Sequence, residues 1–268
     1  MNLYIDFGGT HFKYCFDNED VIVEKSSGVD LVSFLDTQIA LQTKRGKTIK
    51  NIAISFAGQV RDGVILYAPN IDLKELYIQQ YIEEKYGINV VVENDLNIAS
   101  IYEYSKYKNL NSMAVLYIGT GFGCGIVIGG KVLYGKDSFA GEIGHIPFRK
   151  RDTKCSCGRD DCLELSVSGK ALRGLKLNEV DGKTKQIFLD GLVHSFFTLL
   201  NLLNCDGYVF GGSVIQNNIW LVDFLKEEYK KSSFYNLRGE LMMVVSDAQY
   251  GNIEGLKLII KDRDNGKI

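Results

Sequence analysis

Two segments of the chain each place a glycine-rich turn between two apolar strand patterns. The first is NLYIDFGGTHFKYCF at residues 2–16, and the second is MAVLYIGTGFGCGIVIGGKVLY at residues 113–134. The tripeptide Leu-Tyr-Ile precedes the turn in both, at residues 3–5 and 116–118. Recurrence of a strand, turn and strand unit is typical of an internal repeat. We therefore expect two lobes built on one plan that face each other across a ligand cleft.

The glycine turns are candidate ligand sites, because glycine lets backbone N–H groups approach a bound anion closely. The first turn carries Asp6, Gly8, Gly9 and Thr10, and a third glycine turn follows residues 205–210. Taken alone, the first turn is also consistent with a plain tight turn. Its recurrence favours one ligand that is bound by a glycine hairpin from each lobe.

The rest of the chain alternates helical and strand patterns, which indicates an α/β protein. Apolar periodicity predicts helices at 29–41, 73–86, 96–107, 168–175, 185–203, 221–229 and 253–261, and strands at 51–56, 90–92, 205–210 and 241–245. We expect an N-terminal α/β lobe at 1–110 and a C-terminal α/β lobe at 111–268. A last helix at about 253–264 is expected to pack back on the N-terminal lobe.

Polar side chains follow the predicted strand at 90–92 and open the next helix. They are Glu93, Asn94 and Asp95. Open α/β sheets bind their ligands at the carboxyl ends of strands. A carboxylate there could orient an attacking alcohol and accept its proton during phosphoryl transfer. The alternative for Asp95 is a structural cap at the start of the helix.

Three of the six cysteines lie close together in CSCGRDDC, as Cys155, Cys157 and Cys162, with His145 ten residues upstream. Three thiolates and one imidazole can close a tetrahedral zinc shell, which predicts a structural rather than a catalytic ion because no position stays open for water. Three reduced surface thiols are the alternative. Glu142 and Glu164 flank the cluster.

The formal net charge of −2 offers no basic field for nucleic acid or acidic lipid. Asp6 interrupts the first apolar run, and no run reaches the roughly 18 uncharged apolar residues of a membrane span. Cys15, Cys124 and Cys205 stand singly among apolar neighbours, as buried reduced thiols do. We therefore expect a cytoplasmic protein with no nucleic-acid or membrane partner.

Two familiar nucleotide-binding motifs are excluded. A Walker A loop fails at Gly46-Lys47-Thr48 because Leu41 stands where the first glycine is needed. A dinucleotide fingerprint in the second turn would need glycine at Cys124, and a strand rather than a helix follows. The remaining hypothesis is that β-hairpins bind the phosphates.

Six motifs, in order and spacing, resemble the ROK family, the grouping of repressors, open reading frames and sugar kinases. They are DFGGT at 6–10, END at 93–95, GTGFGCG at 119–125, AGEIGH at 140–145, CSCGRDDCLE at 155–164 and VFGGS at 209–213. The resemblance covers essentially the whole chain. It implies an actin-like ATPase and sugar kinase fold, with two lobes and MgATP and a hexose in the cleft between them.

The resemblance also implies residue roles. It makes Asp95 the base that acts on the sugar hydroxyl. The implied sugar-binding residues are Asn94, Glu142, His145, Glu164 and, from the LYAPNI segment at 66–71, Asn70. The implied ATP-binding residues are Asp6, Gly8, Gly9, Thr10, Gly119, Thr120, Gly121, Gly123, Gly211 and Gly212. We expect Asp6 to contact Mg²⁺ through water, because hard Mg²⁺ prefers carboxylate oxygen and its own waters. His145 would bind zinc through one ring nitrogen and the sugar through the other.

Three positions depart from the family pattern. Cys124 and Ser213 stand where glycines are usual, and Asp161 replaces a glycine before the last zinc cysteine. None of these changes removes a ligand or the base, so they bear on tuning more than on activity.

The family leaves several functions open. GEIGHIP and CLELSVSGKALRGLK look most like the D-allose kinase branch. Glucose and N-acetylmannosamine are the next substrates, and a non-catalytic sugar sensor is a further alternative. Repressor members carry a helix-turn-helix module before the first motif, whereas five residues precede Asp6, so DNA binding is not expected. The resemblance also implies a homodimer.

Overall fold

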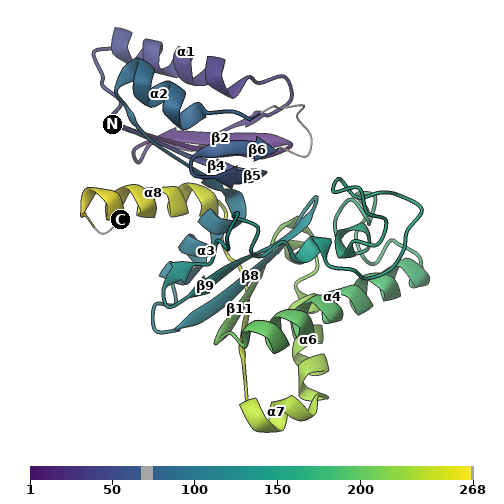
Figure 1. The fold of residues 1–268 in the computed structure, drawn as a ribbon. Coiled ribbons are helices and arrows are strands. Elements are labelled where there is room, and N and C mark those ends of the chain that lie inside the picture. The colour runs from purple at the N-terminus through teal and green to yellow at the C-terminus, as the bar shows by residue number, and fades with distance from the viewer. Residues whose placement is uncertain (68–74, 267–268) are drawn as a thin grey trace. The chain divides into compact units, whose positions relative to one another are not determined.

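The computed structural model describes residues 1–67 and 75–266, and each of the two repeats forms a hairpin within a five-stranded sheet (Figure 1). The first sheet has the order β3-β2-β1-β4-β7, with β1 Asn2–Phe7, β2 His11–Phe16, β3 Ile22–Lys25, β4 Asn51–Phe56 and β7 Asn89–Asn94. The second has the order β10-β9-β8-β11-β12, with β8 Ser112–Ile118, β9 Phe122–Ile128, β10 Lys131–Val132, β11 Gly207–Gly211 and β12 Met242–Val245.

The two sheets share one topology. In each sheet, the first three strands along the chain pair antiparallel as a meander. The fourth strand pairs in parallel with the first, and the fifth pairs in parallel with the fourth. The hairpins even end alike, with Phe7 opposite Phe12 and Ile118 opposite Phe122 as the last pairs before the turn. The internal repeat predicted from the glycine turns is therefore confirmed.

The chain divides into two compact units. Unit 1 comprises residues 1–102, 136–138 and 249–268, and unit 2 comprises residues 103–135 and 139–248. The chain first passes from one unit to the other within α3 (Asp95–Ser105), between Tyr102 and Glu103.

The first sheet of unit 1 is covered on both faces. Leu35 of α1 (Leu31–Lys44) and Ile78 of α2 (Ile78–Tyr86) pack against Ile5 on one face. On the other face, Leu256 of α8 (Gly251–Asp264) packs against Tyr4. Side chains alternate between the faces of a strand, so burial of both faces explains why β1 and β4 carry apolar side chains on both faces.

Side chains of the second sheet form a buried hydrophobic cluster with those of α4 (Gly182–Leu203) and α6 (Trp220–Lys230). α4 is long and apolar enough, by length and composition, to cross a membrane. However, Phe188, Leu192 and Phe196 are fully buried in the core of unit 2, as expected of the core helix of a globular domain.

Short elements between the main ones were not predicted. They are β5 (Gln59–Arg61), β6 (Val64–Tyr67), α5 (Ser213–Gln216), α7 (Ser233–Arg238) and the 3-10 turns η1 (Ile143–His145) and η2 (Leu163–Leu165). The predicted helix at 73–86 begins at Ile78, and its first two residues lie outside the described part of the chain.

The predicted helix at 168–175 is wrong, because this segment is a series of turns. The N–H groups of Gly169 and Lys170 donate to the carbonyls of Gly119 and Thr120 rather than to carbonyls of a helix of their own. Pairing with the second glycine turn overrides the local helical pattern.

Candidate active site

Asp6 lies near the carboxyl end of β1 and is almost fully buried, with 8% of its surface exposed. Its Oδ1 accepts hydrogen bonds from Ser55 Oγ at 3.1 Å and from Asn252 Nδ2 at 2.8 Å. Its Oδ2 pairs with Lys13 Nζ at 3.1 Å. Partners from β2, β4 and α8 therefore hold this carboxylate in place below the first glycine turn.

The strand register extends this polar row across the sheet. Lys13 lies opposite Asp6, Ser55 is opposite Asp6 on the other side, and Glu93 lies opposite Ser55. β1, β4 and β7 run in parallel, so their carboxyl ends meet at one edge of the sheet. Asp95 follows β7 at this edge, the place where open α/β sheets bind ligands.

Asn94 caps α3 through two helical N–H groups, one of which it shares with Asp95. Asn94 Oδ1 accepts from the N–H groups of Leu96 at 2.9 Å and Asn97 at 3.2 Å, and Asn94 Nδ2 donates to the carbonyl of Gly58 at 2.9 Å. An oxygen that accepts from the second and third helical N–H groups is the usual N-cap. Asp95 Oδ1 also accepts from Leu96 N at 2.9 Å. The END motif therefore does contain a helix cap, and the main capping residue is Asn94.

The second glycine turn connects β8 and β9 and is held by the segment that follows the cysteine cluster. Glu164 Oε2 accepts a hydrogen bond from the backbone N–H of Phe122 at 2.9 Å. The Gly119 carbonyl accepts from Gly169 N at 2.7 Å. Gly121 passes so close to Glu164 that an added β-carbon would lie 2.6 Å from Oε2. Glu164, a residue predicted to bind the sugar, is therefore in direct contact with a turn predicted to bind phosphate.

The third glycine turn follows β11. Gly211 packs on the ring of Tyr117, so closely that a β-carbon on Gly211 would lie 2.5 Å from the ring. The Tyr117 hydroxyl donates to Glu103 and also bonds Ser246. Burial raises the pKa of Tyr117, so this phenol stays neutral and supplies a fixed wall beneath Gly211.

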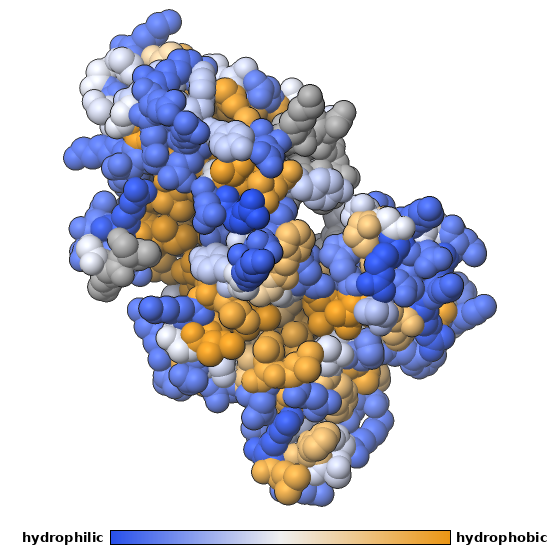
Figure 2. Space-filling model, viewed as in Figure 1, coloured by the Kyte–Doolittle hydropathy of each residue, from blue (hydrophilic) through white to orange (hydrophobic). Residues whose placement is uncertain are grey.

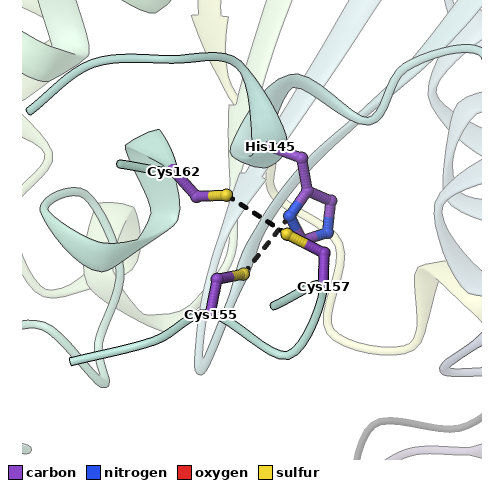
Figure 3. A group of neighbouring side chains, drawn as sticks. All are labelled: His145, Cys155, Cys157 and Cys162. Carbon is purple, nitrogen blue, oxygen red and sulfur yellow. Dashed lines mark hydrogen bonds between the residues drawn. The ribbon is translucent and has the colours of Figure 1, made fainter. Parts of the chain in front are cut away.

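Four side chains converge at the predicted zinc site (Figure 3). The ligand atoms of His145, Cys155, Cys157 and Cys162 all lie within 4.8 Å of one another. Cys157 Sγ lies 3.3 Å from Cys162 Sγ, and Cys155 Sγ lies 3.4 Å from His145 Nδ1. A tetrahedral ion with metal–sulfur bonds of about 2.3 Å separates its sulfurs by about 3.8 Å. The cluster therefore fits a four-coordinate zinc ion. The loops between β10 and α4, teal in Figure 1, present a mostly hydrophilic surface in the same view (Figure 2).

The thiols of this cluster have unequal acidities. The backbone N–H of Arg159 lowers the pKa of exposed Cys157, whereas burial raises the pKa of Cys162 to about 12. Zinc binds thiolates, so ion binding would displace the Cys162 proton.

His145 uses its two ring nitrogens in two directions. Nδ1 faces the thiols, and Nε2 lies 3.7 Å from Glu142 Oε2. Loss of hydration raises the pKa of Glu142, with Glu164 adding to the rise and His145 opposing it, although 42% of the Glu142 side chain stays exposed. Glu142, His145 and Glu164 thus form one electrostatic group beside the metal cluster.

The predicted residues fall into the two units. Unit 1 contains the first glycine turn, Asp6, Asn94 and Asp95, and unit 2 contains the other glycine turns and the Glu142, His145 and Glu164 group. Asn70 lies outside the described residues.

Lys13, Ser55 and Asn252 are partners of Asp6 that the sequence patterns did not predict. Lys13 could have been found from hairpin alternation, because positions 6 and 13 are opposite each other. Asn252 has no local signal, since it is 246 residues away along the chain.

The model of the ROK family matches residues 3–257. The chain belongs to the ROK family. It is 30% identical over 243 residues to an N-acetylmannosamine kinase from Escherichia coli, which covers 80% of this chain and 83% of that protein. A glucokinase from Halalkalibacterium halodurans is 30% identical over 213 residues, and the match spans 64% of that protein's length.

Solved structures of ROK proteins share the fold. A ROK hexokinase from Thermus thermophilus matches with a TM-score of 0.75 and 24% identity over 97% of this chain and 99% of that one. A ROK transcriptional regulator, described as a homologue of the Escherichia coli MLC protein, matches with a TM-score of 0.82 and 20% identity over 99% of this chain and 78% of that one. The two-lobed, actin-like α/β fold expected from the motifs is confirmed, and kinases and regulators share it.

Proposed function

We propose that this ROK protein is an ATP-dependent hexose kinase that transfers the γ-phosphoryl group of MgATP to a sugar hydroxyl, the primary 6-hydroxyl by expectation. The observation that carries this proposal is the position of Asp95. It follows β7 at the same sheet edge as buried Asp6, and Asn94 performs the capping role that would otherwise account for an acid there.

In this reaction Asp95 orients the sugar hydroxyl and accepts its proton as the oxygen–phosphorus bond forms. The bond from the γ-phosphorus to the bridging oxygen breaks, and ADP leaves with those electrons. Asp6 would hold Mg²⁺ through water, since hard Mg²⁺ prefers carboxylate oxygens and its own waters, and the ion would neutralise charge on the phosphates. Phosphates bind at the glycine turns of residues 8–10 and 119–123, and the turn at 211–212 lies beside the adenosine.

The sugar is assigned to Asn94, Glu142, His145, Glu164 and Asn70. The Asn94 side chain already caps α3 through Oδ1 and donates to the Gly58 carbonyl through Nδ2. Any hydrogen bond to a sugar hydroxyl would be made in addition to these two. A zinc ion held by His145 and the three cysteines would be structural, because protein ligands fill its shell. Its chemistry is to fix the loop that positions Glu142, His145 and Glu164.

Within the hexoses, the resemblance favours D-allose. The names of the relatives support N-acetylmannosamine and glucose as the alternatives. A site that bonds a sugar hydroxyl rejects an analogue that leaves a buried group unpaired, at about 1–3 kcal/mol for each group. We propose a cytoplasmic enzyme that needs no nucleic acid or membrane and forms a homodimer.

The likeness to a transcriptional regulator supports a second candidate, a sugar sensor that binds hexose without consuming ATP. ATP consumption measured across aldohexoses, ketohexoses and N-acetylated amino sugars separates the two. Turnover with one class of sugar supports the kinase and names its substrate. Sugar binding without turnover on any of these compounds would establish the sensor instead.

A further inference from the structure

We propose that Glu103 is a positioning residue for the nucleotide, because it fixes the third glycine turn, Gly211 and Gly212, through Tyr117 and Ser246. This inference rests on the proposed kinase function, in which that turn lies beside the adenosine. All of these residues belong to unit 2.

Glu103 is a buried carboxylate that no step of the proposed reaction uses. Its side chain is 1% exposed, and among the residues that the structure describes, Asp6 and Glu103 are the buried side chains that carry a charge. Burial of a carboxylate costs free energy unless hydrogen bonds and an opposite charge replace its hydration. The position of Glu103 therefore depends on the partners that surround it.

These partners form a closed polar network. Glu103 Oε1 accepts hydrogen bonds from the Tyr117 hydroxyl at 3.2 Å and from Ser246 Oγ at 2.5 Å, and the two hydroxyl oxygens lie 3.1 Å apart. Glu103 Oε2 pairs with Lys106 Nζ at 3.1 Å. Buried networks in which each member is bonded are rigid. One carboxylate thus fixes the orientation of both hydroxyl groups.

The third glycine turn is attached to this network on three sides. The ring of Tyr117 lies against Gly211, where an added β-carbon would be 2.5 Å from it. The backbone N–H of Ser246 donates to the carbonyl of Phe210, just before the turn, at 2.8 Å. The carbonyl of Ser246 accepts from Gln216 Nε2, in the helix after the turn, at 2.6 Å. Displacement of either partner of Glu103 would therefore change the shape of the turn.

The internal repeat supports a role at the ligand site. Asp6 and Tyr117 occupy equivalent positions, since each lies in the strand pair next to the last pair of its hairpin. Asp6 is bonded by Asn252 of α8, the helix that follows the last strand of the second sheet. Tyr117 is bonded by Glu103 of α3, the helix that follows the last strand of the first sheet. Equivalent helices thus hold equivalent positions, and the one in unit 1 is already assigned to the nucleotide.

Calorimetric titration of the full chain with MgADP tests this role. The variants are Glu103→Ala and Tyr117→Phe, and the second keeps the ring against Gly211 in case the first fails to fold. Glu103→Gln is the conservative variant, because its amide keeps an acceptor oxygen for the two hydroxyl groups. Tyr229→Phe is the matched control, since it removes the same atom from a buried tyrosine of unit 2 that bonds the Gly239 carbonyl at 3.0 Å.

We expect Glu103→Ala and Tyr117→Phe to weaken MgADP binding by about 3- to 10-fold, because each removes a hydrogen bond that fixes the turn. Glu103→Gln and Tyr229→Phe should stay within about 2-fold of wild type. Melting temperatures of the ligand-free variants show which of them are folded at the titration temperature. A purely structural contact would lower the melting temperature of Tyr117→Phe and Tyr229→Phe alike without changing either affinity.

Two results would overturn the positioning role while wild-type binding of MgADP leaves the kinase proposal intact. One is wild-type affinity in both Glu103→Ala and Tyr117→Phe. The other is a loss in Glu103→Gln or Tyr229→Phe as large as that in Glu103→Ala. Failure of the wild-type protein to bind MgADP would instead overturn the kinase proposal together with this one.

Discussion

Glu164 Oε2 accepts the backbone N–H of Phe122 at 2.9 Å, which joins the loop after the cysteine cluster to the start of β9. The glutamate comes from the predicted sugar site, and the N–H belongs to the second glycine turn. A side chain that bonds both a hydroxyl and this turn would let sugar occupancy influence phosphate binding. The variant Gly121→Ala tests what this contact contributes to sugar binding.

Gly121→Ala should weaken sugar binding while the fold is kept. The new β-carbon would lie 2.6 Å from Glu164 Oε2, and that atom is the movable end of a side chain. The carboxylate must therefore leave Phe122 N–H, and we expect sugar affinity to fall by about 3- to 10-fold, equivalent to about 1 kcal/mol. Calorimetric titration of the sugar measures this. Gly182→Ala, where nothing lies within 4 Å, is the control, and wild-type affinity in Gly121→Ala would contradict the role of this contact.

Asp95→Asn should abolish phosphorylation but retain sugar binding. The amide keeps the size of the side chain but cannot accept the hydroxyl proton, and a positioned base contributes about 10²- to 10⁴-fold to the rate. Initial rates of ATP consumption and a separate sugar titration measure the two effects. Near-normal turnover would remove Asp95 from the catalytic role.

The protein should contain about one zinc ion per chain, and Cys157→Ser should lose it, since a structural site needs its complete shell. Elemental analysis of the purified protein gives the metal content. Ser156→Ala is the matched control, because Ser156 is the exposed neighbour of two ligands and lies outside the converging set. A wild-type protein without bound metal would leave the cluster as free thiols.

Gly141→Ala should strongly destabilise unit 2. Gly141 has a φ of +91°, and a β-carbon there would lie 1.9 Å from the backbone carbonyl oxygen of Cys124. Backbone cannot move aside as a side chain can, so the cost should be about 3 kcal/mol or more. Gly129→Ala separates strain from collision, because Gly129 also has positive φ but meets nothing within 4 Å, and it should cost about 1 kcal/mol. Denaturant midpoints measure both, and equal losses would contradict the collision.

Asp36 should contribute stability that disappears on acidification. Burial acts to raise its pKa, but hydrogen bonds from Lys85, Tyr81 and Tyr86 outweigh burial and lower it. A folded-state pKa below the unfolded value gives stabilisation that is full above the unfolded value and is lost as pH falls through the folded one. With 30% of the side chain exposed, the contribution should be about 1 kcal/mol.

Thermal unfolding of Asp36→Asn measures this contribution. The melting temperature should lie below wild type at pH 7, and the difference should shrink between about pH 5 and pH 3. Asp20→Asn, at an exposed position in the same unit, is the control. A difference that stays constant with pH would show that the ionised form has no special role.

Local patterns in the sequence predicted the elements that local forces control. The strand at 51–56 is β4 to the residue, and Gly87 ends α2 in the left-handed conformation at φ 67°. The metal cluster was also predictable, because the three cysteines lie so close together in the sequence that a short loop brings their side chains together. Repetition of the glycine turns predicted the shared topology of the two sheets.

Partners distant in the chain were decided by the tertiary structure. Asn252 reaches Asp6 because α8 returns to the first sheet, and the segment at 168–175 gives up its helical pattern to bond the second glycine turn. The sequence by itself thus determined the family, the glycine turns and the metal ligands. Only the tertiary structure decided which carboxylate oxygens are held, and by which donors, because hydrogen bonding depends on distances that strand register and helix packing set.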